Sequence, residues 1–379
     1  FLYTHEEVTD ATVWSVPVVL KVGSGSGVSE IRHLLEERSS DVKLDSPADW
    51  VVVNAGGSGF FRARYTKGML KSVSRDMFSN LTSVERYGLV DDTWSSVMAG
   101  RTSAEDFLEF ARSFHLETDL DVWTVLSGCL SGLEKLVEGE AENHYKAVVR
   151  DLAQPGLDRL GWEPGETDSP RDLELRGLFI RLLANVGDDD LAQDNAGDLH
   201  DSYLRDAGSV EPNMAAAVTG VVASKGDTAE YDRFLEKYRD PSTPQEERRY
   251  QSALSAFPGE PEMKRTLKMT LDGTVRTQDA PYLLAVCMRN KYQGHIAWDF
   301  VKENWDKINE VFPSNSIVRM LSGVTSLSKP SEAEDVLAFF EDHEVPQGQL
   351  TLQQTLEKLQ VIVALRARET ERFSASLTS

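Results

Sequence analysis

The chain has 379 residues, of which 40% are hydrophobic and 27% are charged, as is typical of a folded globular protein. Its formal net charge of −22 repels phosphates and anionic lipids, so we expect neither nucleic acid nor membrane as a partner. No apolar run approaches the ~18 residues that a membrane span needs. The two cysteines, Cys129 and Cys287, lie in apolar helical patterns, which favours buried free thiols and a cytoplasmic location.

Residues 1–66 carry β patterns, and we expect them to form the first domain, a small truncated β-sandwich. Runs rich in β-branched or aromatic residues, or alternating in polarity, predict strands at 12–22, 41–44, 50–54 and 60–65. Pro17 places the first of these strands at a sheet edge, because proline cannot donate a ladder hydrogen bond. The glycine cluster at 56–59 predicts a hairpin between the last two. So few strands need a partner sheet, or further strands, to cover one face.

From Lys67 onward the apolar period becomes helical. Six capping boxes, in which an N-cap oxygen stands three residues before an acid, mark helix starts. They are Thr82…Glu85, Ser103…Asp106, Ser169…Asp172, Asp227…Glu230, Thr243…Glu246 and Ser331…Glu334. A helix pair takes roughly 35 to 40 residues, the length of HEAT-like hairpins, which stack because one pair cannot bury its own apolar face. We therefore expect a mostly α chain, with an irregular α-superhelix of such hairpins over residues 67–379 as the second domain.

Two further patterns predict packing rather than chemistry. Trp298 and Trp305 are seven residues apart and share one helical face, which favours a place in the core over a substrate shelf. The acidic run 188–190 lacks the alternating oxygen ligands of a calcium loop, so we expect a turn followed by a helix N-cap.

No group of residues with catalytic chemistry is evident. A zinc-peptidase signature needs two histidines one helical turn apart, with a glutamate beside the first. The nearest match begins at His5, where Thr9 replaces the second histidine, and His343 fails in the same way, with Gln347 four residues on. The glycine cluster at 56–59 lacks the Lys-Ser/Thr pair and the following helix of a phosphate loop. We therefore expect no catalytic residue and no metal ligand in this chain.

Four stretches carry a family pattern, and they occur in a fixed order along the chain. They are W-V-V-V-N with G-F-F-R-A-R-Y (50–65), L-G-W-E-P (160–164), D-G-T-V-R-T-Q-D-A (272–280) and A-W-D-F-V-K-E-N-W (297–305). Together they resemble the C-terminal, post-catalytic region of the aminopeptidase N-like zinc metallopeptidases. The resemblance implies a parent enzyme that removes residues one at a time from peptide N-termini. In that family the helical region closes over the zinc site and forms the wall of a peptide chamber.

The implied cofactor and partners follow from the same resemblance. This chain itself would hold no cofactor, because zinc belongs to the catalytic domain of the parent chain. That domain and peptide substrates are the expected partners. The family's HExxH and GxMEN motifs are absent here, and Phe1 resembles a point inside the strand that family members begin with a QxRF sequence. We therefore expect an inactive portion of a longer chain.

One alternative comes from another functional class. A free-standing helical-repeat scaffold that binds protein partners would show the same periodicity. An HExxH-coding region directly upstream of this sequence would exclude it.

Three residues are candidates for the wall of the chamber. Arg276 matches the arginine of the family's VRxQD segment, and the resemblance implies that it faces the chamber, where a guanidinium could pair with a substrate carboxylate. The other interpretation is a structural contact between Arg276 and Asp279 that fixes the start of the next helix. Gln278 is open to the same two interpretations. Arg319 is a lone cation in an apolar helix, and its stem packing on the core with its head in water is the competing interpretation.

Overall fold

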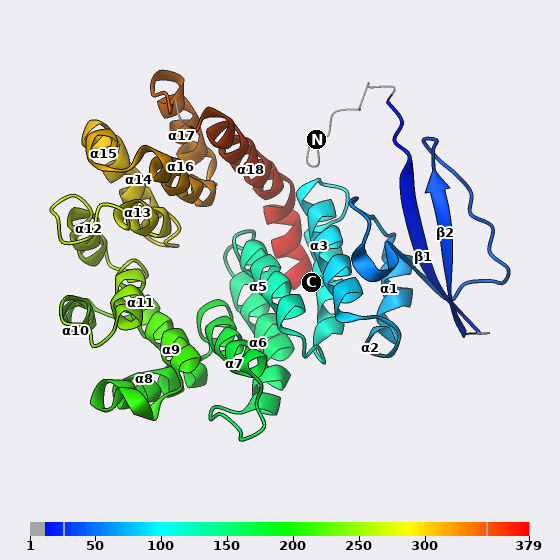
Figure 1. Cartoon of the computed structure of the whole chain (residues 1–379), viewed down its shortest axis with the longest axis horizontal. Coiled ribbons are helices and arrows are strands. Elements are labelled where there is room, and N and C mark those ends of the chain that lie inside the picture. Colours follow the sequence, from blue (N-terminus) through cyan, green and yellow to red (C-terminus); the bar gives the residue numbers. More distant parts are fainter. Residues whose placement is uncertain (1–11, 26, 346–347, 379) are drawn as a thin grey trace. The chain divides into compact units, whose positions relative to one another are not determined.

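The computed structural model describes residues 12–25, 27–345 and 348–378 (Figure 1). Three strands near the N-terminus precede a series of helices that continues to the end of the described chain. The prediction of a mostly helical chain with a small sheet before it is confirmed. That the helices repeat as HEAT-like hairpins of a superhelix stays a prediction. No helix in the described ranges is both long enough and apolar enough to cross a bilayer.

The sheet contains β1 (Val16–Ser24), β2 (Gly27–Leu35) and β3 (Trp50–Val53). All pairings are antiparallel and the order is β2-β1-β3, with Leu20 opposite both Ile31 and Val53. The expected edge position of Pro17 is therefore wrong, because β1 is the central strand. β3 pairs only with Leu20 to Gly23, so at Pro17 the ladder has β2 on one side and none of the described strands on the other. A missing N–H is tolerated there.

The predicted hairpin around the glycine cluster is also wrong, because 60–65 is irregular. Asn54 adopts a left-handed conformation with φ 69°, and its side chain binds both the N–H and the C=O of Gly59 at 2.7 and 3.0 Å. The chain then turns away from β3. The Tyr65 hydroxyl bonds the N–H and the C=O of Val53, and Asp92 accepts from the N–H of Ala63. Side chains thus bind backbone groups of Val53, Gly59 and Ala63 that would have bonded to another strand if 60–65 had paired with β3.

Two other strand predictions have different outcomes. The run 41–44 is irregular, and none of the described strands pairs with it. β2 is a strand that the patterns do not predict. All of its residues are exposed or half-buried, so no buried face requires apolar and polar residues to alternate along it. The chain start at Phe1 and the motif beginning at His5 lie outside the described residues.

The chain divides into two compact units. The first comprises Phe1–Leu175 with Arg368–Ser379, and the second comprises Arg176–Ala367. The predicted division into domains 1–66 and 67–379 stays a prediction, although the first helix does begin at Lys67. The unit boundaries fall inside α7 (Pro170–Arg181) and α18 (Gln349–Thr378).

The first unit is a helical layer attached to the sheet. Besides the start of α7 and the end of α18, its helices are α1 (Lys67–Ser74), α2 (Met77–Asn80), α3 (Ser83–Met98), α4 (Ala104–Ala111), α5 (Leu120–Glu134) and α6 (Ala141–Leu160). Glu85 on α3 accepts from Lys21 of β1 and from the N–H of Gly56, which ties the sheet to the helices. The end of α18 lies beside α3 in Figure 1, and Glu369 accepts from the N–H of Ala104 at the start of α4.

The described part of the second unit consists of helices and the loops that connect them. Its helices are α8 (Asp190–Arg205), α9 (Pro212–Lys225), α10 (Thr228–Arg239), α11 (Pro244–Leu254), α12 (Glu260–Met269), α13 (Ala280–Met288), α14 (Gly294–Glu303), α15 (Trp305–Val311), α16 (Ser314–Leu321) and α17 (Pro330–Asp342), with parts of α7 and α18. Consecutive helices pack in pairs, α8 on α9 and α10 on α11, and α13 contacts both α14 and α16. Trp298 and Trp305 are buried against Phe339, which confirms the predicted packing role.

Helix starts follow the capping signals at five of the six predicted positions. Thr82, Ser103, Ser169, Asp227 and Thr243 each accept from the N–H three residues on. The sixth is wrong, because α17 begins at Pro330, one residue before Ser331, and its N-cap Lys329 makes no side-chain cap. Proline fits that first position, since its missing N–H is not needed there. Asp189 caps α8 through the N–H of Ala192, as the acidic run predicts.

Candidate functional site

Arg276 and Gln278 lie in the connection between α12 and α13. The connection begins after Met269 and ends where Ala280 starts α13. The backbone carbonyl of Arg276 accepts from the N–H groups of Asp279 and Ala280, at 2.9 and 3.0 Å. The main chain of Arg276 therefore forms the turn that leads into α13, and its side chain is left for another contact.

The shape of this loop follows from its sequence. Gly273 has φ 89°, a left-handed conformation that a side chain would strain. The carboxylate of Asp272 accepts from the N–H of Thr274 at 3.0 Å, and the hydrogen bonds from Thr274 hold the pKa of Asp272 below its ordinary value. Val275 is buried beneath the loop, and the Tyr238 hydroxyl donates to the C=O of Thr274. These contacts fix the backbone from which Arg276 projects.

The side chain of Arg276 pairs with Glu247 in the first turn of α11. A single nitrogen, Nη2, donates to both carboxylate oxygens of Glu247, each at 2.9 Å. Within the described part of the chain, Nε and Nη1 of Arg276 have no hydrogen-bond partner. The Arg276 side chain is 64% exposed, against 23% for Glu247. The guanidinium is thus held from one side, and further N–H donors face solvent.

Glu247 stands next to a carboxylate with a different environment. Glu246 is buried and accepts from the Tyr203 hydroxyl and from the N–H of Ser242, at 2.9 and 2.6 Å. Burial acts to raise the pKa of Glu246, but the hydrogen bonds from Ser242 and Tyr203 outweigh it, so that pKa lies below its ordinary value. Glu246 therefore anchors the start of α11, and Glu247 is the carboxylate that faces Arg276.

The other two candidates do not join this pair. Gln278 is exposed in the same loop as Arg276. Arg319 is exposed on α16, which packs against α13 and has Ile317, Val318 and Met320 in the core. Among the contacts of the described residues, none links Arg319 to Arg276 or Gln278. The site therefore consists of one loop with a paired arginine, and Arg319 is a separate exposed cation.

A protein metal site needs several donor side chains gathered around one point. No group of three or more His, Cys, Asp or Glu side chains able to hold a metal occurs within the described ranges. The His343 ring is stacked on Phe339 at 3.8 Å between ring centroids, and its Nδ1 lies 2.7 Å from the Phe339 carbonyl. Packing accounts for this histidine.

Glu247 is the site residue that the sequence patterns miss. It lies on α11, 29 residues before Arg276, which is in the loop before α13. The signal that could have found it is weak, since Glu246 and Glu247 form an acidic pair in a predicted first helical turn. The structural interpretation of Arg276 named Asp279 instead, and the described side-chain contact is with Glu247.

Comparison with known proteins gives a consistent result. The family described as "ERAP1-like C-terminal domain" matches residues 50–361. Aminopeptidase M1 of Arabidopsis thaliana is 27% identical over 376 residues, which cover 92% of this chain and 42% of the relative. Endoplasmic reticulum aminopeptidase 2 of Bos taurus is 28% identical over 87% of this chain and 35% of its own length. Puromycin-sensitive aminopeptidase of Caenorhabditis elegans is 28% identical over 78% of this chain and 32% of its own length. The chain thus spans less than half the length of these relatives.

Proposed function

The chain belongs to the ERAP1-like C-terminal domain family, and on that premise we propose that it is the non-catalytic C-terminal portion of a zinc aminopeptidase. The parent enzyme removes N-terminal residues from peptides. The names of the relatives support this, since each of the three is an aminopeptidase. The partners in this proposal are the catalytic domain of the parent chain and the peptide substrate.

Within the parent, this region closes over the active site and forms part of the peptide chamber. Arg276 binds the C-terminal carboxylate of the peptide, and Gln278 and Arg319 lie on the same chamber wall. The observation that carries the proposal is the geometry of Arg276. Glu247 contacts only Nη2 of Arg276. The guanidinium can therefore bind a second carboxylate through its other N–H groups without breaking the pair with Glu247.

The zinc of the parent enzyme is proposed for its catalytic region, because the described residues of this chain do not fit a metal. We expect the purified chain to bind no stoichiometric zinc and to leave aminoacyl-anilide substrates uncleaved. Elemental analysis and an anilide assay test both expectations. One tightly held zinc per chain would contradict the assignment of this region as non-catalytic.

The role of Arg276 is tested in the full-length parent enzyme with three kinds of substrate. Arg276→Ala should lower kcat/KM for a peptide by about 10-fold, the equivalent of ~1.4 kcal/mol. The same peptide with an amidated C-terminus, and an aminoacyl-anilide, have no carboxylate at that end and should change little. Arg265→Ala is the matched control, since Arg265 also pairs with a surface carboxylate, Asp232. An equal loss on all three substrates would overturn the carboxylate role.

A free-standing scaffold is the competing proposal, and the genomic sequence before the codon for Phe1 distinguishes the two. A region that encodes HExxH in the same reading frame excludes the scaffold. We place the parent in the cytoplasm, a proposal supported by two cysteines that are buried and free. Fractionation of cells that express the tagged parent tests this location against the endoplasmic reticulum, after which the relative from Bos taurus is named.

A further inference from the structure

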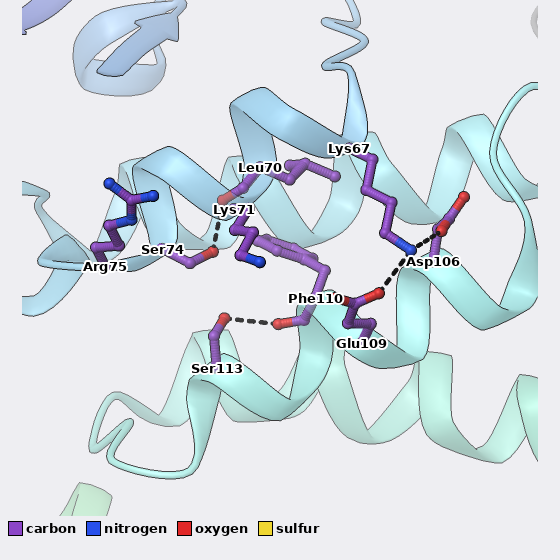
Figure 2. A pocket seen from close by; sticks show the side chains of 9 residues that line it. All are labelled: Lys67, Leu70, Lys71, Ser74, Arg75, Asp106, Glu109, Phe110 and Ser113. Carbon is purple, nitrogen blue, oxygen red and sulfur yellow. Dashed lines mark hydrogen bonds and ion pairs between the residues drawn. The ribbon is translucent and has the colours of Figure 1, made fainter. Parts of the chain in front are cut away.

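A small pocket lies between α1 and the α4 region of the first unit, distant in sequence from Arg276 (Figure 2). Its volume is about 200 Å³. Three of its lining residues are the cations Lys67, Lys71 and Arg75. They are spaced four residues apart, so they share one face of α1 and its C-cap. In a chain with a net charge of −22, this is a local concentration of positive charge.

The three cations differ in how they are neutralised. Lys67 contacts both carboxylates of the opposite wall, Asp106 at 2.8 Å and Glu109 at 2.7 Å. Lys71 and Arg75 are exposed, and within the described ranges neither has an ion-pair or hydrogen-bond partner. Figure 2 shows the dashed contacts on Lys67 and none on the other two cations. The five charged groups sum to one net positive charge, and the two cations without a partner, Lys71 and Arg75, are the ones open to a ligand.

The remaining lining of the pocket is apolar or already hydrogen-bonded. Leu70 and Phe110 are almost fully buried and supply hydrocarbon surface. The hydroxyl of Ser74 donates to the C=O of Leu70 at 2.8 Å, and that of Ser113 donates to the C=O of Phe110 at 2.6 Å. A ligand would therefore meet hydrocarbon inside and cations at the rim.

We propose that this pocket binds a small organic anion with a carboxylate on an apolar body. The carboxylate pairs with Lys71 and Arg75, and the apolar body lies against Leu70 and Phe110. The volume is below the ~300–1,000 Å³ of pockets for drug-sized molecules, so the ligand is small. Asp106 and Glu109 would repel an anion, and Lys67 offsets one of their two negative charges. The Lys67 contacts are therefore part of the site.

The test uses the full chain and a matched pair of probes, 3-phenylpropionate and its neutral amide, 3-phenylpropionamide. Titration calorimetry at low ionic strength should show tighter binding of the acid, and added salt should reduce the difference, because exposed charges are screened. Each exposed charge contact is worth a factor of up to about five in a binding constant. The variant with both Lys71→Gln and Arg75→Gln should therefore bind the acid about 2- to 25-fold more weakly, with no change for the amide.

A second variant has the opposite expected sign. Glu109→Gln removes a negative charge and leaves Lys67 freer to contact the ligand, so it should bind the acid about two- to five-fold more tightly. A misfolded variant would not gain affinity, so this result also separates binding from structural damage. Lys358→Gln is the control, since it removes one exposed positive charge on α18. Equal binding of acid and amide, no binding of the acid, or a loss in Glu109→Gln would each overturn the proposal.

Discussion

Arg86 and Glu117 form an ion pair in the core of the first unit, with both side chains almost completely buried. Nε and Nη2 of Arg86 donate to the two oxygens of Glu117 at 2.6 and 2.8 Å. Arg86 also donates to the C=O of Leu81, and Glu117 accepts from the N–H groups of Thr118 and Asp119. The pair thus connects the first turns of α3 to the segment that leads into α5. Each charged group faces its counter-charge and also makes hydrogen bonds to the backbone.

Removing one partner should be strongly destabilising. Glu117→Ala leaves the Arg86 guanidinium buried without a counter-charge, and we expect a loss of about 3–5 kcal/mol in the free energy of unfolding. Urea denaturation followed by circular dichroism measures it. Arg171→Ala is the comparison, since Arg171 pairs with Asp121 at the surface, where solvent screens the attraction, and its loss should be far smaller. Similar losses in the two variants would show that burial of the pair is not decisive.

His200 should make the stability of the second unit depend on pH. Burial lowers the pKa of His200 to about 4, and its Nε2 lies 3.2 Å from the Tyr250 hydroxyl. The unfolded chain protonates this histidine near pH 6.5 and the native protein does not, so the unfolded state binds more protons between these values. Stability should therefore fall as the pH decreases from about 6.5 to 4, by up to about 3 kcal/mol.

Two variants isolate this effect in thermal melts across that range. His200→Phe removes the titrating ring from an aromatic cluster with Phe234, and the slope of Tm against pH should become shallower. Tyr250→Phe keeps the histidine and loses only the hydroxyl, so the slope should persist. An unchanged slope in His200→Phe would mean that other groups produce the acid sensitivity.

Local signals in the sequence predicted local structure well. The pairing of Thr82 with Glu85 lies within one turn, and the structure contains the complete capping box. Gly161 ends α6 with φ 68°, a backbone angle that favours glycine. The strand errors arise where the partner is remote or absent. Asn54 and Gly59 resemble hairpin residues, but contacts with Asp92 on α3 draw the following segment away from the sheet.

The candidate site shows the same limit. Arg276 could be singled out from its family segment, and its loop position before α13 agrees with the sequence pattern. Its partner Glu247 could not be predicted, because two helices separated in sequence must pack before these residues meet. The cations Lys67, Lys71 and Arg75 are spaced four residues apart, a pattern that by itself predicts an exposed helix face rather than a site. The carboxylates opposite them come from α4 and required the fold.

The loop that carries Arg276 depends on the conformation of Gly273. Its φ of 89° disfavours a side chain, although no atom lies within 4 Å of the position that a Cβ would take. Gly273→Ala should therefore cost about 1–3 kcal/mol of unfolding free energy through backbone strain alone. Gly128→Ala has equally open surroundings inside α5 and should instead stabilise by about 0.5–1 kcal/mol. Denaturant unfolding of both variants checks the signs, and stabilisation by both would refute the strain.

The pair of Arg276 and Glu247 should contribute little to folding. Arg276 is 64% exposed and donates through one nitrogen, so solvent screens most of the attraction. A double-mutant cycle with Arg276→Ala and Glu247→Ala should give a coupling free energy below about 1 kcal/mol. Because a weak internal partner leaves the guanidinium available to a ligand carboxylate, this result would fit a role in peptide binding. A coupling of about 2 kcal/mol or more would instead identify Arg276 as a structural tether between α11 and the start of α13.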